Sequence, residues 1–109
     1  MADADLRPGQ YGLSARSLET VKKLLSKYPG IRSAVLYGSR ARGTYKNGSD
    51  IDLTLHTDDA FTHADLLRLA NDFDDSDLPY MVDLSEYRKL QNENLKEHIR
   101  RVGKVLYER

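Results

Sequence analysis

The sequence has 109 residues and no cysteine, and its 17 Lys or Arg residues are balanced by 17 Asp or Glu. A chain of this length forms one domain with a modest core, too small to combine a catalytic domain with separate substrate-recognition domains. The lack of cysteine excludes a disulfide framework and a thiolate metal site. No apolar run reaches transmembrane length, and the N-terminus lacks the apolar core of a signal peptide, so we expect a soluble, cytoplasmic protein without a membrane role.

The charges are unevenly distributed along the chain. Residues 1–49 carry nine basic residues against three acidic ones, residues 50–83 carry ten aspartates against one arginine, and residues 84–109 have a basic excess of three. An acidic centre between two basic arms suits a metal-bound polyphosphate. Six of the aspartates fit solvated loops better: Asp58, Asp59, Asp72, Asp74, Asp75 and Asp77. No broad basic surface is predicted, so we do not expect direct binding of duplex nucleic acid.

In chain order, the pattern predicts alternating helices and strands after a polar tail over residues 1–13. Ser14 or Ser17 caps a helix whose apolar residues recur at helical spacing, and Pro29-Gly30 ends it. Residues 33–37 form a short strand, apolar on both faces and therefore central, which Gly38 ends. Residues 51–56 alternate between apolar and polar side chains, which indicates a strand with one buried face.

The second half of the chain continues this alternation. Thr62 begins a helix with an apolar side, and residues 80–84 are predicted to form a third strand after an acidic loop. A C-terminal helix begins at about Asn92 or Asn94 and ends at Gly103, and residues 104–107 add an edge strand. The predicted fold is therefore α/β, a small mixed β-sheet with flanking helices, formed by residues 14–109.

The segment from Gly38 to Leu53, GSRARGTYKNGSDIDL, carries the functional signal. Gly38 lets the backbone pass close to a phosphate, and Ser39 can begin a short helix whose free N–H groups and hydroxyl hold phosphate oxygens. Ten residues later, Asp50 and Asp52 occupy alternate positions of the predicted strand, so both carboxylates leave one face roughly 6.6 Å apart along the chain. Oxygen-only ligands suit Mg²⁺, and paired Mg²⁺ ions lie about 3.5–4 Å apart in phosphoryl-transfer sites.

A Gly-Ser pair followed after ten residues by Asp-x-Asp resembles the nucleotidyltransferase superfamily of DNA polymerase β. The whole segment resembles its minimal nucleotidyltransferases (MNT), which are short prokaryotic proteins usually encoded beside an all-helical partner of the HEPN or nucleotidyltransferase-substrate-binding type. In the order of its elements the resemblance covers residues 14–109, and it implies a polymerase β-like nucleotidyltransferase fold. It also implies a third carboxylate from a later strand, and Asp83 matches that position by sequence order and by alternation.

This resemblance assigns catalytic and metal-binding roles to the three carboxylates. Asp50 and Asp52 are the expected ligands of two Mg²⁺ ions, and Asp83 is expected to help hold the ion beside the attacking hydroxyl. Three converging carboxylates repel each other, so without a cation at least one of them should have a raised pKa. The three histidines lie on different predicted elements and are interpreted as ordinary polar residues: His56, His63 and His98.

The resemblance also implies how the nucleotide is held. Gly38 and Ser39 are expected to bind the β- and γ-phosphates of ATP, the substrate. Arg42 matches the arginine of the family's Ala-Arg-Gly segment and is expected to offset phosphate charge, whereas Arg40 occupies a variable position.

Two classes of function follow. The first is a Mg²⁺-dependent adenylyltransferase that moves AMP from ATP to a hydroxyl, above all a tyrosine, of a co-encoded HEPN-type partner, and so acts as the antitoxin of a toxin–antitoxin pair. The second is a non-catalytic binding module that neutralises the same partner by complex formation. A small-molecule nucleotidyltransferase of the aminoglycoside type is weaker, because the chain lacks a second domain to hold the acceptor. A lone Asp-x-Asp also occurs on solvated strands and in glycosyltransferases. The Gly-Ser pair ten residues upstream favours the nucleotidyltransferase interpretation over both.

Overall fold

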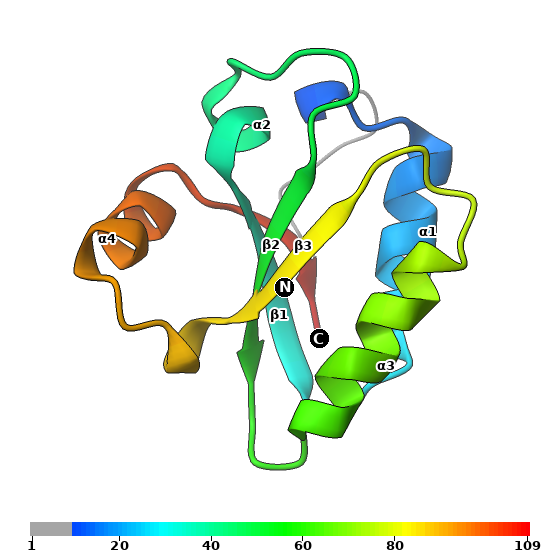
Figure 1. The fold of residues 1–109 in the computed structure, drawn as a ribbon, viewed down its shortest axis with the longest axis vertical. Helices are drawn as coiled ribbons and strands as arrows, with labels where there is room; N and C mark the ends of the chain where they lie inside the picture. Colours follow the sequence, from blue (N-terminus) through cyan, green and yellow to red (C-terminus); the bar gives the residue numbers. More distant parts are fainter. Residues whose placement is uncertain (1–9) are drawn as a thin grey trace.

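The structure, a computed structural model, describes residues 10–109 (Figure 1). The predicted tail spans residues 1–13, and its first nine residues lie outside the described part of the chain. The described elements are, in chain order, η1 (Gln10–Gly12), α1 (Ala15–Ser26), β1 (Ile31–Tyr37), α2 (Gly38–Arg42), β2 (Ile51–Thr57), α3 (His63–Asp74), β3 (Val82–Glu86), η2 (Tyr87–Lys89), α4 (Glu93–Val102) and β4 (Lys104–Glu108). No helix among the described residues is long and apolar enough to cross a membrane.

The strands form one mixed sheet with the order β3-β2-β1-β4. Strand β1 is antiparallel to both of its neighbours, and β2 runs parallel to β3. The predicted mixed sheet, the central position of β1 and the edge position of β4 are therefore confirmed.

Helices cover the two faces of the sheet unequally. Helices α1 and α3 lie together on one face, and α4 lies on the other, with α2 at the end of β1 (Figure 1). The main core forms under α1 and α3, where the alternation of β2 places Ile51, Leu53 and Leu55 fully out of solvent. A smaller cluster of Val35, Tyr37 and Ile99 lies between the sheet and α4. The polar side chains of β2 consequently face α4.

Side-chain caps fix where the helices begin. Ser14 accepts a hydrogen bond from the Ser17 amide and caps α1, so the first of the two predicted starts is the observed one. Thr62 and Asp65 form a reciprocal capping box at the start of α3. Asn92, and not Asn94, caps α4, which ends at Gly103 as predicted.

All four strands differ from their predicted bounds, although β2 and β4 only extend one residue further at their C-terminal ends. Strand β1 begins at Ile31, two residues earlier than expected, and β3 spans Val82–Glu86 instead of 80–84. The shift in β3 has a physical cause, because the ring of Tyr80 packs on the guanidinium of Arg40 and does not join the sheet. Pairing with β2 starts with Ile51 opposite Val82.

Candidate active site

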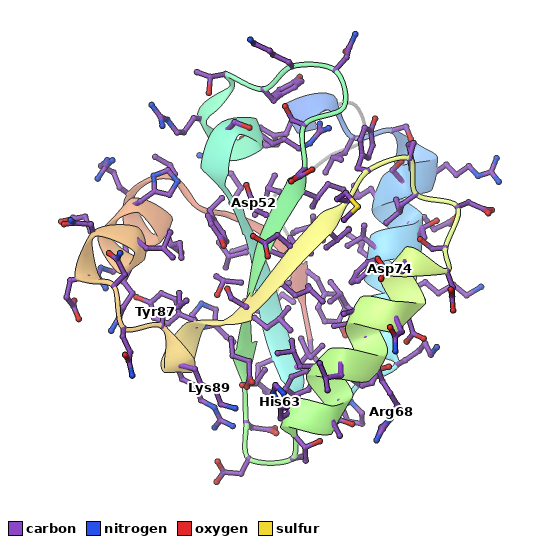
Figure 2. The ribbon with its side chains drawn as sticks, viewed as in Figure 1. Asp52, His63, Arg68, Asp74, Tyr87 and Lys89 are labelled. Carbon is purple, nitrogen blue, oxygen red and sulfur yellow. The ribbon has the colours of Figure 1, made fainter. Side chains whose placement is uncertain are left out.

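Sheet register brings two of the predicted carboxylates together. Asp52 lies directly opposite Tyr37 on β1 and directly opposite Asp83 on β3. Because residues that face each other across neighbouring strands project from the same face, Asp52 and Asp83 share the face covered by α4. Figure 2 shows Asp52 near the start of β2, beside α2.

Asp50 completes the acidic group from the loop. It lies one residue before β2 and not within the strand, which corrects the prediction that both aspartates belong to the strand. Asp50 and Asp83 are exposed, and Asp52 is half-buried. Burial, followed by the carboxylates of Asp83 and Asp50, raises the pKa of Asp52 above its ordinary value. The carboxylates of Asp83 and Asp50 therefore act electrostatically on Asp52, as expected for converging carboxylates.

The Gly-Ser turn lies directly against Asp52. Gly38 begins α2 with a φ of 75°, a left-handed backbone conformation that side chains disfavour. A Cβ atom built on Gly38 would overlap the Asp52 carboxylate. Both the backbone angle and the close approach thus require glycine, and they hold Ser39 and the short helix α2 beside the acidic group.

His98 is a site residue that the sequence analysis missed. It comes from α4, and its Nε2 accepts a hydrogen bond of 3.1 Å from the Gly38 amide. Its ring also meets the Tyr37 ring edge to face, at 6.2 Å between centroids. Burial, then the charges of Arg42 and Arg101, lower the pKa of His98, which favours the neutral form that can accept this bond. Sixty residues separate the bonded pair, so no local pattern could have indicated it.

Tyr37 lies beside Asp52, its register partner across β1 and β2. Burial raises the pKa of Tyr37, and the carboxylates of Asp52 and Asp83 add to that rise. Burial and the nearby negative charges therefore both favour the protonated phenol. One step further along the same strands, the Ser85 hydroxyl donates to Thr54 Oγ1 at 3.0 Å. This polar pair lies beside Asp52 and Asp83 and ties β2 to β3.

The two arginines of α2 have opposite environments. Arg42, for which the sequence predicts a phosphate role, is exposed on α2. Arg40, which occupies a variable position of the motif, is 2% exposed and donates three hydrogen bonds to backbone carbonyls. The contacts of Arg40 are far more extensive than its sequence position indicated.

The remaining polar residues of the sequence analysis lie away from this group. His56 stacks on Tyr87, at 4.9 Å between ring centroids, and His63 is exposed at the start of α3. Asp72 and Asp74 belong to α3, which corrects their prediction as loop residues. Asp72 accepts a hydrogen bond from the Tyr28 hydroxyl, and burial together with this bond raises the pKa of Tyr28 to about 12.

The donor set fits a magnesium ion shared with a nucleotide. Among the described residues, no three His, Cys, Asp or Glu side chains form a ready-made metal cage. Mg²⁺ does not need one, because it is usually held by one or two carboxylates together with substrate phosphates and waters. Burial, followed by the carboxylates of Asp83 and Asp50, raises the pKa of Asp52, so a positive charge beside these carboxylates would favour the ionised form. Oxygen donors and electrostatics both suit a hard divalent cation.

Known proteins share this sequence and this architecture. The family described as polymerase beta nucleotidyltransferase matches residues 19–109. A Haemophilus influenzae protein described as the probable protein adenylyltransferase MntA is 31% identical over 100 residues, which span 92% of this chain and 87% of the relative.

Solved structures of toxin–antitoxin complexes share the fold of this chain. A toxin–antitoxin crystal structure with AMP-PNP aligns with a TM-score of 0.69 and 28% identity over 84% of this chain and 73% of that one. A tri-AMPylated Shewanella oneidensis HEPN toxin in complex with its MNT antitoxin aligns with a TM-score of 0.62 and 25% identity, over 84% of this chain and 70% of that one. The family implies a nucleotide substrate and metal dependence in general. The chain is a nucleotidyltransferase and belongs to the polymerase β nucleotidyltransferase family.

Proposed function

We propose that the protein transfers AMP from ATP to a hydroxyl of a helical HEPN-type partner encoded beside it, above all a tyrosine, and thereby acts as an antitoxin. Two relatives support this assignment. One is described as a protein adenylyltransferase, and the other is an MNT antitoxin in complex with an AMPylated HEPN toxin. The reaction joins the acceptor oxygen to the α-phosphorus, breaks the bond to pyrophosphate, and releases the proton of the acceptor hydroxyl.

The observation that carries the proposal is the contact between the Gly-Ser turn and the paired aspartates. Gly38 has no side chain and lies against Asp52, and the sheet register places Asp83 directly beside Asp52. A phosphate held by the turn would therefore lie next to the carboxylates. This arrangement suits phosphoryl transfer, in which positioning and electrostatic stabilisation supply most of the catalysis.

Asp50, Asp52 and Asp83 are the residues that would hold two Mg²⁺ ions. When bound, the ions would neutralise phosphate charge and stabilise the attacking and leaving oxygens. The chain's own residues orient the substrate. In this proposal Gly38 and Ser39 hold the β- and γ-phosphates, and the exposed Arg42 offsets their charge.

Mass spectrometry of the two proteins mixed with ATP and Mg²⁺ tests the proposal. We expect the intact partner to gain the mass of AMP, and we expect no adduct when Asp50→Asn and Asp52→Asn are combined. Circular dichroism of the double variant controls for loss of the fold. If the double variant neutralises the partner as well as the parent does, and no adduct forms, the protein is a binding module. Rapid modification of a free aminoglycoside would instead indicate a small-molecule enzyme.

A further inference from the structure

Arg40 is a buried cation at the base of the site loop. Its Nε and Nη2 donate to the carbonyl oxygen of Ser49 at 3.1 and 2.7 Å, and its Nη1 donates to the carbonyl oxygen of Tyr11 at 2.8 Å. Within residues 10–109, no carboxylate lies within ion-pair distance of Arg40. The guanidinium is therefore balanced by backbone carbonyls, which fix its plane and direction.

Two aromatic rings enclose the same guanidinium. Its central carbon lies 4.4 Å from the centroid of the Tyr80 ring and 5.2 Å from that of the Tyr45 ring. Both distances are within the range of a cation–π interaction, which is stronger where the cation is removed from water. Arg40 is 2% exposed, so these contacts are well desolvated.

The partners of Arg40 come from the segments that carry the site. Ser49 immediately precedes Asp50, Tyr45 belongs to the loop that joins α2 to β2, and Tyr80 lies three residues before Asp83. Arg40 itself follows Ser39 on α2. One side chain thus connects the Gly-Ser turn to the backbone before Asp50 and to the segment that leads into β3.

The N-terminal segment is shaped to fit this side chain. Tyr11 has a φ of 56°, a left-handed conformation that is uncommon for a residue with a side chain, and Gly12 follows with a φ of 74°. A Cβ atom on Gly12 would lie 2.7 Å from both Arg40 Nη1 and Tyr45 Cε2. The strained turn therefore presents its carbonyl to Arg40 where only glycine leaves enough room.

From these contacts we infer that Arg40 is the positioning residue of the active site, which sets the distance between the phosphate-binding turn and the metal-binding carboxylates. Arg40 acts through Ser49 and Tyr80 and touches neither substrate nor metal. The expected effect of Arg40 on catalysis rests on the proposed function. Its expected effect on the loop of residues 43–50 rests on the geometry alone.

The test compares Arg40→Met and Arg40→Lys with Arg109→Met. Arg109 is a matched control, because it also donates three hydrogen bonds to backbone carbonyls, in its case those of Ser26, Tyr28 and Ile31, at the far end of β1. Lysine keeps the charge of Arg40 but has no planar fork to bond Ser49 and Tyr11 together.

Hydrogen exchange without metal or nucleotide provides the first readout. Both Arg40 variants should exchange the amides of residues 43–50 at least about tenfold faster, and Arg109→Met should leave that loop at the parental rate. The second readout is calorimetric titration of Mg²⁺ in the presence of AMP-PNP. Both Arg40 variants should need about 10–100-fold more Mg²⁺, and transfer to the partner should lose kcat more than it changes the KM for ATP.

Several results would overturn the inference. Parental loop exchange and a parental Mg²⁺ requirement in folded Arg40→Met would show that Arg40 only stabilises the fold. Full restoration by Arg40→Lys would show that charge alone matters. If Arg40→Met does not fold, Tyr45→Leu must still speed loop exchange while Tyr45→Phe, which keeps the ring, must not, and equal behaviour of the two would refute the inference. If the parent forms no AMP adduct, the proposed function fails, and the exchange measurement still decides the role of Arg40.

Discussion

The surroundings of Asp52 in the folded protein disfavour its ionised form. Burial and the carboxylates of Asp83 and Asp50 raise its pKa above 3.8, the value for an ordinary aspartate. Because the folded pKa is the higher one, this group favours folding below about pH 3.8 and loses that contribution as the pH rises through the folded pKa. At neutral pH the ionised carboxylate therefore destabilises the metal-free protein, a cost often found at functional sites.

We predict that Asp52→Asn unfolds at a higher temperature than the parent at neutral pH in a chelator. A gain of about 1 kcal/mol corresponds to about 4–8 °C in a domain of this size. Thermal unfolding followed by circular dichroism provides the measurement. Asp74→Asn is the matched control, because Asp74 is exposed on α3 (Figure 2), and it should leave the midpoint unchanged. A midpoint of Asp52→Asn at or below that of the parent would contradict the account.

The helices and strands themselves could be predicted because their signals are local. Ser14, Thr62 and Asn92 cap helices through bonds to amides three residues later, and the alternation around Asp52 reflects which face of β2 is buried. The motif from Gly38 to Leu53 likewise spans a continuous segment. These features need no knowledge of distant residues.

The contacts that complete the site could not be predicted in this way. Arg40 bonds Tyr11 across 29 positions, and His98 bonds Gly38 across 60. These pairs form because α4 and the N-terminal segment pack against the sheet. A local sequence pattern does not indicate how such distant segments pack. The sequence pattern predicts the start of β3 two residues too early for the same reason, because Tyr80 packs on Arg40 instead of joining the sheet.

Helix α4 is tied to the Gly-Ser turn by one titratable contact. The pKa of His98 is lowered from 6.5 by burial and by the charges of Arg42 and Arg101. Because the folded pKa is the lower one, the stability from neutral His98 is complete above about pH 6.5 and is lost as the pH falls through the folded pKa. Protonation also removes the Nε2 lone pair that accepts from the Gly38 amide.

We therefore predict that His98→Gln, whose amide oxygen can accept but does not titrate, loses less stability than the parent between about pH 7.5 and 5. Urea unfolding across this range gives the free energies of unfolding to compare. His63→Gln, at an exposed position on α3, controls for the loss of a histidine as such and should follow the parental profile. Identical pH profiles for His98→Gln and the parent would show that the contact does not contribute to stability.

The residues of the main core that stabilise the fold and the paired carboxylates of the acidic group lie on opposite faces of the sheet. The main apolar core lies under α1 and α3 on one face of the sheet, and α4 covers the other face (Figure 1). The register of β2 and β3 places Asp52 and Asp83 on the face of α4. A radius of gyration of 13.0 Å is close to the value of about 13 Å expected for a compact domain of 100 residues. Substitutions in the acidic group can therefore remove binding while the core keeps the fold, which makes the site directly testable.

The central claim is that the Gly-Ser turn and the aspartates form one metal-dependent nucleotide site. Calorimetric titration with AMP-PNP, in Mg²⁺ and in a chelator, tests it without any partner protein. We predict that the parent binds at least about tenfold more tightly in Mg²⁺, and that combined Asp50→Asn and Asp52→Asn removes this difference while circular dichroism stays parental. Equal affinity of the parent in Mg²⁺ and in the chelator would contradict the claim.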